Sequence, residues 1–199
     1  MHHVMLDLET FGVRPGSVIR SIAAVEFEVD GRTGDRFYRN VDRRSCEIAG
    51  LTIDPETVAW WRTQPAEVEA LLRKDPRPLV EVARDFYKWF NGIGPANRMR
   101  LWSHGASFDG PLWQAAAEAA GGAVPWAHWN TRDTRTLFDL AMLDIREMQR
   151  DGKAHSALDD CLFQIKCVVA AYQRISVDTK AYLHGIQRKP PPEEEDVFA

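Results

Sequence analysis

The chain has 199 residues, which is the usual size of one domain that buries a core without disulfides or a structural metal. Its composition is 45% hydrophobic and 27% charged, as in an ordinary globular protein, and no apolar run approaches the roughly 20 residues that cross a bilayer, which excludes a membrane span. The formal net charge of -4 gives no support to nucleic-acid binding by electrostatics alone, although most of the basic residues are Arg, which grips phosphate oxygens in pairs.

The N-terminal residues and the cysteines indicate a cytoplasmic protein. Residues 1–5 have neither the basic start nor the apolar stretch of a secretory signal, because Asp7 and Glu9 follow at once. The odd number of cysteines and the lack of a CxxC pair argue against a disulfide framework. We interpret all three as small buried hydrophobic residues: Cys46, Cys161 and Cys167.

The first forty residues have the pattern of strands. Alternating, β-branched and aromatic residues predict three strands in sequence, joined as a meander with a turn at Asp30-Gly31. The three predicted strands are His3–Glu9, Val18–Val29 and Asp35–Val41. Pro55 then marks a change to helical spacing, which continues in two segments as far as Asn91.

The remainder of the chain alternates between strands and helices. The predicted elements are strand Arg98–Ser103, helix Ser107–Ala120, strand Trp126–Thr131, helix Thr134–Gln149 and helix Ala157–Arg174. This order predicts an α/β fold with a five-stranded mixed sheet flanked by helices. We expect one domain over residues 1–188 and a disordered tail, rich in Pro and then acidic, over residues 189–199.

Two acids on the first strand are the first candidate site residues. Asp7 and Glu9 are two positions apart, so their side chains point to one face of the strand while Leu6 and Leu8 point to the other. Adjacent carboxylates in a buried setting repel each other unless a cation neutralises them. A solvated face of an edge strand is the commoner explanation for such a pair, but the apolar neighbours indicate a central strand.

A second cluster lies at the start of the last predicted helix. Ser156 and Asp159 have the spacing of a capping box, which gives Asp159 a structural role and leaves Asp160 free. The helix N-terminus favours Asp160 as a carboxylate, the form that a divalent cation requires. His155 precedes the cap and is able to fold back over Asp160; the alternative is a loop histidine without a function.

Asp109 follows the fourth predicted strand, in a first helical turn that we expect Ser107 to cap. An acid there ordinarily stabilises the helix dipole, but ligands in open α/β sheets gather at strand ends. The four acids together fit a site for two Mg²⁺ or Mn²⁺ ions, which take oxygen ligands and activate a water for attack on phosphorus. This arrangement leaves His155 as the general base.

Together these residues resemble the DEDDh 3′→5′ exonucleases of the RNase H-like superfamily. The three family motifs occur in the expected order as Asp7-Leu8-Glu9-Thr10, His104-Gly105-Ala106-Ser107-Phe108-Asp109 and His155-Ser156-Ala157-Leu158-Asp159-Asp160. A sister group carries Tyr four positions before the last Asp, where this chain has Ser156, so the histidine version is favoured.

The resemblance implies a role for each residue. Asp7, Glu9 and Asp160 would hold the ion that carries the attacking water, and Asp7 with Asp109 would hold the second ion. His155 would accept the proton from that water. The expected contacts to the terminal nucleotide are Thr10, Phe11, which would stack on the base, His104 and Phe108.

The implied activity is hydrolysis at the 3′ end of single-stranded RNA or DNA, with release of nucleoside 5′-monophosphates. Gly105 departs from the family pattern, because many relatives carry Asn there. The insert with Trp60-Trp61 and the segment 129–135 are more similar to a short branch that includes the RNase AS exoribonucleases. This branch implies a homodimer and slightly favours RNA over DNA.

Several alternatives stay open. Trp60 and Trp61 either stack on bases or, as we favour, belong to the core or a subunit interface. Arg132, Asp133 and Arg135 hold phosphates or form a local ion-pair network. For the whole chain, the alternative is a catalytically silent module of the same fold that binds nucleic-acid ends, against which the complete residue set argues. An endonuclease of the same superfold is a third possibility.

Overall fold

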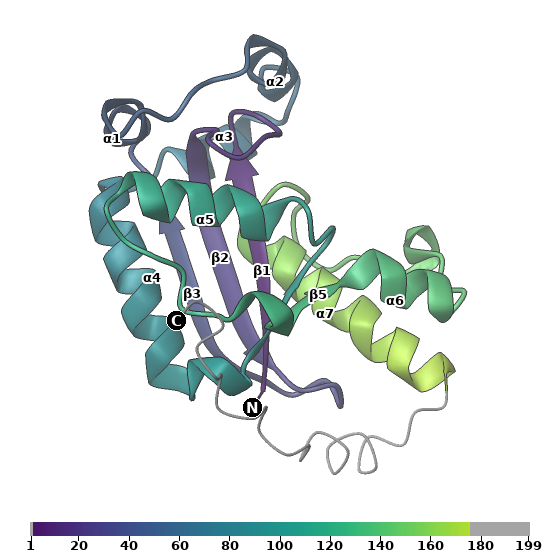
Figure 1. Cartoon of the computed structure of the whole chain (residues 1–199). Coiled ribbons are helices and arrows are strands. Elements are labelled where there is room, and N and C mark those ends of the chain that lie inside the picture. Colours follow the sequence, from purple (N-terminus) through teal and green to yellow (C-terminus); the bar gives the residue numbers. More distant parts are fainter. Residues whose placement is uncertain (1, 176–199) are drawn as a thin grey trace, which may run out of the picture.

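The structure is a computed structural model that describes residues 2–175, and it confirms an α/β fold with a five-stranded mixed sheet flanked by helices (Figure 1). The strands are β1 (His3–Thr10), β2 (Ile19–Phe27), β3 (Thr33–Asn40), β4 (Arg100–Ser103) and β5 (Thr131–Asp133). Their order in the sheet is β3-β2-β1-β4-β5. The first three strands pair antiparallel, whereas β4 is parallel to β1 and β5 is parallel to β4. β1 is therefore the central strand.

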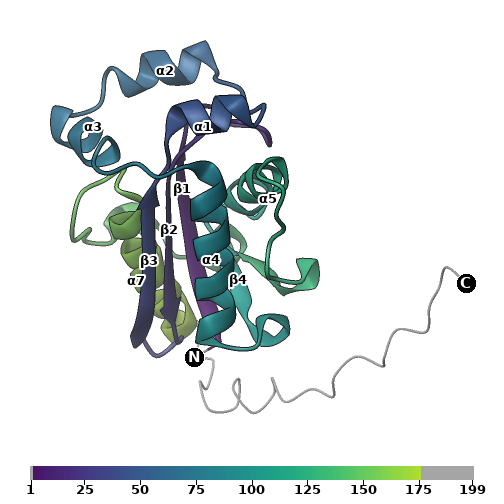
Figure 2. The ribbon, with the colours of Figure 1, turned by 90° about the vertical axis from the view of Figure 1, so that its left-hand side faces the viewer.

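Helices cover both faces of the sheet and one of its ends. They are α1 (Arg43–Ile48), α2 (Pro55–Trp61), α3 (Ala66–Leu72), α4 (Leu79–Ile93), α5 (Asp109–Ala119), α6 (Thr134–Leu140) and α7 (Ala157–Arg174). Helices α4 and α5 lie on one face, and α6 and α7 lie on the other (Figure 2). Helices α1, α2 and α3 lie over the end of the sheet where β1 finishes.

β1 is buried on both faces, as its apolar neighbours predicted. Leu6 and Leu8 belong to the core that the sheet shares with α4 and α5, and Met5 belongs to the core that it shares with α6 and α7. Successive side chains of a strand alternate between faces, so Asp7 and Glu9 lie on the same side as Met5, facing α7. The alternative of an exposed edge strand is wrong.

Helix α7 has the predicted bounds and is fixed against the centre of the sheet. The Cys161 thiol donates to the backbone oxygens of Met5 on β1 and Ala23 on β2, at 3.6 Å each. This packing brings the first turn of α7, with Asp160, next to β1. All three cysteines are buried and free, which confirms their interpretation as small core residues.

Several predicted bounds are wrong. The fifth strand begins at Thr131 rather than ending there, because His128–Asn130 form a 3₁₀ turn. The predicted helix Thr134–Gln149 ends at Leu140, since Met142 adopts a left-handed φ of 48° and Asp144 caps a separate 3₁₀ turn over residues 145–147. A further 3₁₀ turn, Ala96–Arg98, precedes β4, so that strand begins later than predicted.

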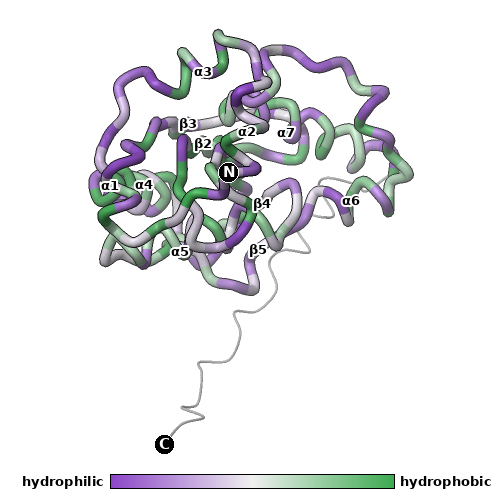
Figure 3. Tube along the Cα trace, turned by 90° about the horizontal axis from the view of Figure 1, so that it is seen from above, coloured by the Kyte–Doolittle hydropathy of each residue, from purple (hydrophilic) through white to green (hydrophobic). Residues whose placement is uncertain are grey.

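Helix α1 was not predicted, because six residues are too few to display a helical period. The region of helical spacing predicted from Pro55 to Asn91 holds three helices, α2, α3 and α4, rather than two segments. The chain on either side of α3 is largely hydrophilic (Figure 3). Among residues 2–175, no helix is long and apolar enough to cross a membrane. The predicted domain end at residue 188 and the tail over 189–199 lie outside the described residues.

Candidate active site

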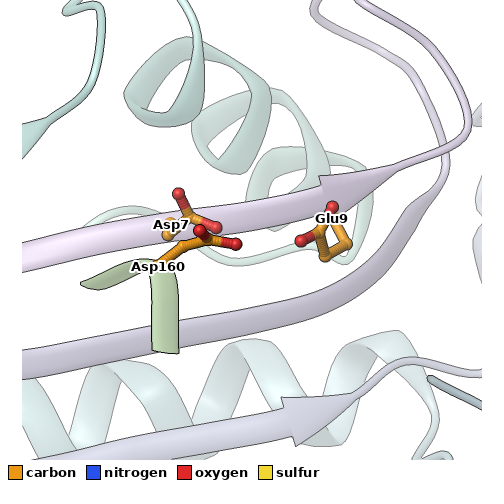
Figure 4. Close-up of side chains that lie close together, drawn as sticks. All are labelled: Asp7, Glu9 and Asp160. Atoms are coloured by element: carbon orange, nitrogen blue, oxygen red, sulfur yellow. The ribbon is translucent and has the colours of Figure 1, made fainter. Parts of the chain in front are cut away.

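Three carboxylates meet between β1 and α7. Asp7 and Glu9 extend from the same face of β1, and Asp160 reaches them from the first turn of α7 (Figure 4). One oxygen atom of each lies within 4.8 Å of the others. Glu9 is buried, and Asp7 and Asp160 are half-buried. The three acids therefore form a compact set of oxygen ligands.

The fourth predicted acid, Asp109, joins the site from the other side of β1. It is the first residue of α5, it is 3% exposed, and its Oδ1 accepts a hydrogen bond from the Leu8 backbone N–H at 3.1 Å. The parallel pairing of β1 with β4 covers only His3 to Met5. Beyond that pairing, the Asp109 carboxylate takes the place of a strand partner, which fixes it beside Asp7.

Burial and mutual repulsion make these carboxyl groups hard to ionise. Burial, and then the charges of Asp109, Glu9 and Asp160, raise the pKa of Asp7 well above its usual range. Burial also raises the pKa of Glu9 to about 8 and that of Asp109 to about 7. A bound cation removes this penalty, and an all-oxygen set of ligands suits Mg²⁺ or Mn²⁺. The donor chemistry thus fits the divalent ions that the sequence predicted.

Gln164 is a site residue that the sequence analysis missed. Its side-chain amide donates to Asp7 Oδ1 at 2.8 Å, and its own carbonyl oxygen is buried without a hydrogen-bond partner. Gln164 lies four positions after Asp160 on α7, so both side chains project from the same face of the helix. The four-residue spacing from Asp160 to Gln164 in the predicted last helix was therefore the sequence feature that could have identified Gln164.

His155 lies directly before the N-cap residue of α7, and its ring rests against α2. Its backbone has a left-handed φ of 63°, and Ser156 follows as the N-cap residue of α7. The His155 ring meets the Trp60 ring edge-on, with centroids 5.0 Å apart, and lies 6.2 Å from the Trp61 ring. The predicted general base is therefore half-buried against two indoles that come from a distant part of the sequence.

The predicted capping box at α7 is wrong. Ser156 is the N-cap residue, but its side chain makes no capping hydrogen bond. Asp159 instead accepts a hydrogen bond at 3.0 Å from the backbone N–H of Lys153, in the loop that precedes the helix. The competing donor, the Lys153 N–H, is a nearby backbone group, and such local partners are common for Asp near turns. Asp159 therefore has the structural role expected of it, with a different partner.

Trp61 anchors α2 to the end of β1. Its indole N–H donates to the Thr10 backbone oxygen at 2.8 Å, and the side chain is buried with α3 residues, which confirms a core position. The Arg20 guanidinium is sandwiched between Trp61 and Phe11, 4.3 and 4.4 Å from the two ring centroids, and pairs with Glu69 of α3 at 2.6 Å. Trp60, in contrast, is 44% exposed and forms no part of this core.

The predicted nucleotide contacts divide into two groups around the acids. Thr10 is buried and its hydroxyl donates to the Gly12 oxygen, while Phe11 has the Arg20 guanidinium over its ring. His104 lies on the opposite side of the site, with Nδ1 2.8 Å from the Thr134 hydroxyl. Phe108 precedes α5 and packs against the core.

A hydrogen bond to a backbone group connects the second motif, residues 104–109, to the segment 131–135. Asp133 caps α6 through the Arg135 backbone N–H and also accepts from the Ala106 backbone N–H. Arg132 donates to backbone oxygens rather than to acids. Gly105 has a φ of 113°, a conformation that disfavours other residues, and the Arg135 guanidinium lies over it. The printed partners of Arg132 and Asp133 are backbone groups rather than each other, so they do not form the predicted local ion-pair network, and the alternative that this segment holds phosphates stays a prediction.

Phe108, not Ser107, is the N-cap residue of α5, and no side chain caps that helix. The prediction that Ser107 caps it is wrong, because the helix starts two residues later than expected. Asp109 is therefore the first helical residue, and its carboxylate is directed to β1.

The five-stranded mixed sheet has the RNase H-like fold, and an acidic pair on its central strand with further acids at the starts of two helices suits metal-dependent cleavage of phosphodiester bonds. The model of one family, the 3′-5′ exoribonuclease Rv2179c-like domain, matches residues 2–172. The chain belongs to this family of 3′-5′ exoribonuclease domains, which confirms the exonuclease resemblance read from its three motifs.

Solved structures agree with this fold. Exonuclease X in complex with 5′ overhanging duplex DNA is 18% identical, with 89% of this chain and 95% of that chain covered and a TM-score of 0.56. The nuclease domain of 3′hExo, a DEDDh family member bound to rAMP, is 14% identical over 86% of this chain and 91% of that one, with a TM-score of 0.55.

The E. coli ExoI-ssDNA complex in its zinc-bound form has a TM-score of 0.59 and is 14% identical. This chain is covered to 92% but spans only 42% of that one. A search of curated proteins finds no match.

Proposed function

We propose that the chain removes nucleotides one at a time from the 3′ end of single-stranded nucleic acid, RNA slightly ahead of DNA, and releases nucleoside 5′-monophosphates. The observation that carries this proposal is the set of Asp7, Glu9 and Asp160, whose oxygens lie within 4.8 Å of one another, with Asp109 hydrogen-bonded to the same strand. Such a set suits two divalent cations better than one, because it offers more carboxylates than a single Mg²⁺ usually takes.

Each acid has a proposed place around Mg²⁺ or Mn²⁺. Asp7, Glu9 and Asp160 would hold one ion, and Asp7 with Asp109 would hold the other. When bound, the two ions supply an activated water and neutralise charge on the leaving oxygen. Gln164 orients Asp7 through its 2.8 Å hydrogen bond, and Leu8 orients Asp109 through its backbone N–H. The protein thereby holds both carboxylates in place before ions and substrate arrive.

His155 is the proposed general base. It precedes the helix that carries Asp160, and it is held from outside that helix by Trp60 and Trp61. An imidazole is suited to accept the proton of the attacking water near neutral pH. Thr10, Phe11, His104 and Phe108 are the proposed contacts to the terminal nucleotide. Thr10 and Phe11 directly follow Glu9, and His104 and Phe108 precede Asp109 by at most five positions, so all four are close in sequence to a candidate metal ligand.

The family description supports RNA as the preferred substrate, because it names exoribonucleases. The related structures were obtained with both kinds of ligand: Exonuclease X with DNA and 3′hExo with rAMP.

We further propose a homodimer, which the exposure of Leu140 (71%) and Met142 (87%) at the end of α6 supports. Light scattering on the purified protein gives the mass in solution. One exonuclease domain and a cytoplasmic location stay predictions.

The decisive experiment is digestion of matched RNA and DNA oligonucleotides, single-stranded and duplex, with Mg²⁺ or Mn²⁺ and mass analysis of the products. Stepwise shortening from the 3′ end with monophosphate products supports the proposal, and Asp7→Ala should abolish it. A circular single strand is the control for endonuclease activity. Tight binding of ends without cleavage under any divalent ion would instead support the silent end-binding module.

A further inference from the structure

Arg150 contacts one of the candidate metal ligands. Its Nη1 donates to Oδ1 of Asp160, and its guanidinium carbon lies 4.2 Å from the centroid of the Phe163 ring. Phe163 follows Asp160 by three positions on α7, so the two contacts hold the guanidinium along one face of the helix. Neither the family motifs nor the metal-binding acids include this arginine.

The loop that carries Arg150 is itself fixed to α7. Lys166 Nζ donates to the Gln149 backbone oxygen at 2.9 Å and pairs with Asp151 at 2.8 Å. The residues on both sides of Arg150 are therefore held by one lysine, which lies less than two helical turns from Asp160. This anchoring places the guanidinium over the acid without relying on the Arg150 side chain alone.

The pair differs in its surroundings from an ordinary surface ion pair. The Asp160 side chain is 14% exposed and the Arg150 side chain is 34% exposed, so solvent screens their attraction less than it screens a fully exposed pair. Asp160 also shares its site with Asp7 and Glu9, whose oxygens lie within 4.8 Å of its own. A guanidinium and a divalent ion thus compete for the same carboxylate.

We propose that Arg150 is an internal counter-ion that exchanges partners. It neutralises Asp160 before metal ions bind, is displaced from this carboxylate by the ions, and then pairs with a phosphate of the bound nucleic acid. The second step rests on the proposed nuclease function. A guanidinium suits both partners, because its planar donors match the oxygens of carboxylate and of phosphate. Metal binding and substrate binding are then coupled through one side chain.

The first test is a calorimetric titration of the nucleic-acid-free protein with Mn²⁺. Arg150→Met should bind Mn²⁺ roughly two- to tenfold more tightly than the wild type, because the competing cation is gone. Arg146→Met is the matched control, since Arg146 pairs with Asp144, which is no part of the site. Arg150→Lys, which keeps the charge, should stay close to the wild type. Unchanged or weaker Mn²⁺ binding by Arg150→Met would overturn the counter-ion role.

The second test measures binding of a labelled single-stranded oligoribonucleotide in EDTA and in Ca²⁺, the latter as a stand-in for the catalytic ion. In EDTA, Arg150→Met and the wild type should bind equally, since Arg150 is held by Asp160. In Ca²⁺ the variant should bind several-fold more weakly, with a shallower salt dependence. Equal loss in both conditions, or no loss in Ca²⁺, would overturn the exchange. A wild-type protein without any exonuclease activity would refute the proposed function, but it would leave the Mn²⁺ titration a valid test of Arg150.

Discussion

The indole ring of Trp60 meets the imidazole ring of His155 at 90°, with their centroids 5.0 Å apart. This edge-on contact joins α2 to the residue before α7, two segments far apart in the sequence. Trp61, next in the chain, is fixed to β1 by its hydrogen bond to Thr10. The side chain of His155 is thus supported by a helix whose own position is set by the strand that carries Asp7 and Glu9.

Replacement of Trp60 should impair turnover more than metal binding. In Trp60→Ala the imidazole loses its support, and we expect kcat to fall about tenfold or more, because small misplacements of a reacting group are costly. Mn²⁺ affinity should stay unchanged, since no carboxylate is touched. Trp60→Phe should retain most of the activity. Trp129→Ala is the control, because Trp129 is exposed and contacts His128 in a similar edge-on manner. An unchanged kcat in Trp60→Ala would contradict the positioning role.

Loss of the Gln164 amide should weaken the metal site. The hydrogen bond from Gln164 stabilises the ionised form of Asp7, so Gln164→Leu raises the pKa of this carboxyl further and removes its orientation. Mutations of groups that orient metal ligands typically cost about 10–100-fold in affinity or activity. Calorimetry with Mn²⁺ measures the effect. Gln114→Leu, which breaks the exposed Gln114–Glu118 pair on α5, should leave Mn²⁺ affinity as it is.

The metal-free protein should lose stability as the pH rises from about 5 to 8.5. Carboxyl groups of the unfolded chain ionise near pH 4, whereas burial and neighbouring charges raise the pKa of Asp7 well above its usual range, that of Glu9 to about 8 and that of Asp109 to about 7. A group with a raised pKa in the folded state contributes stability below its unfolded pKa, and this contribution is lost as the pH rises through the folded value.

Urea unfolding in EDTA from about pH 5 to 8.5 tests whether the free energy of unfolding falls or rises with pH. The free energy of unfolding should fall toward pH 8.5, and saturating Mn²⁺ should restore it by neutralising the acids. Asp7→Asn removes one of the repelling charges, so its stability should depend less on pH than that of the wild type. Rising stability in EDTA over the same interval would show that the acids are not buried together.

Arg20 should contribute to stability through its two aromatic neighbours and Glu69. Arg20→Met keeps the aliphatic packing but removes the cation between Phe11 and Trp61 and leaves Glu69 with only its exposed partner Arg73. We expect a loss of about 1–3 kcal/mol in the free energy of unfolding. Arg73→Met should cost less than about 1 kcal/mol, because Arg73 is 76% exposed. Equal effects of the two substitutions would argue against the sandwich.

The acids were predictable from the sequence because each depends on a local rule. The period of two residues along a strand places Asp7 and Glu9 on one face, and the position of Asp160 in a first helical turn follows from the start of α7. Gln164 was predictable from the same kind of rule, because the helical period places it on the face of α7 that carries Asp160. The order of the motifs then indicated that these separate segments meet.

The support of His155 was not predictable in the same way. It depends on how α2 packs over the end of β1, and the sequence of Trp60-Trp61 is equally compatible with a core, an interface or a base-stacking surface. The contact of Arg150 with Asp160 likewise depends on a loop that Lys166 anchors through a backbone oxygen. Side chains that bind backbone oxygens leave little trace in a residue pattern.

The position of α2 has a consequence for how such an enzyme changes over time. The candidate metal ligands belong to β1, α5 and α7, whereas Trp60, which contacts the proposed base His155, belongs to the connection between β3 and α4. Connections tolerate insertions and substitutions more readily than buried strands do. Under the proposed roles, changes in residues 41–78 would alter turnover and leave ion binding intact, so the rate of the reaction and its requirement for metal would diverge independently.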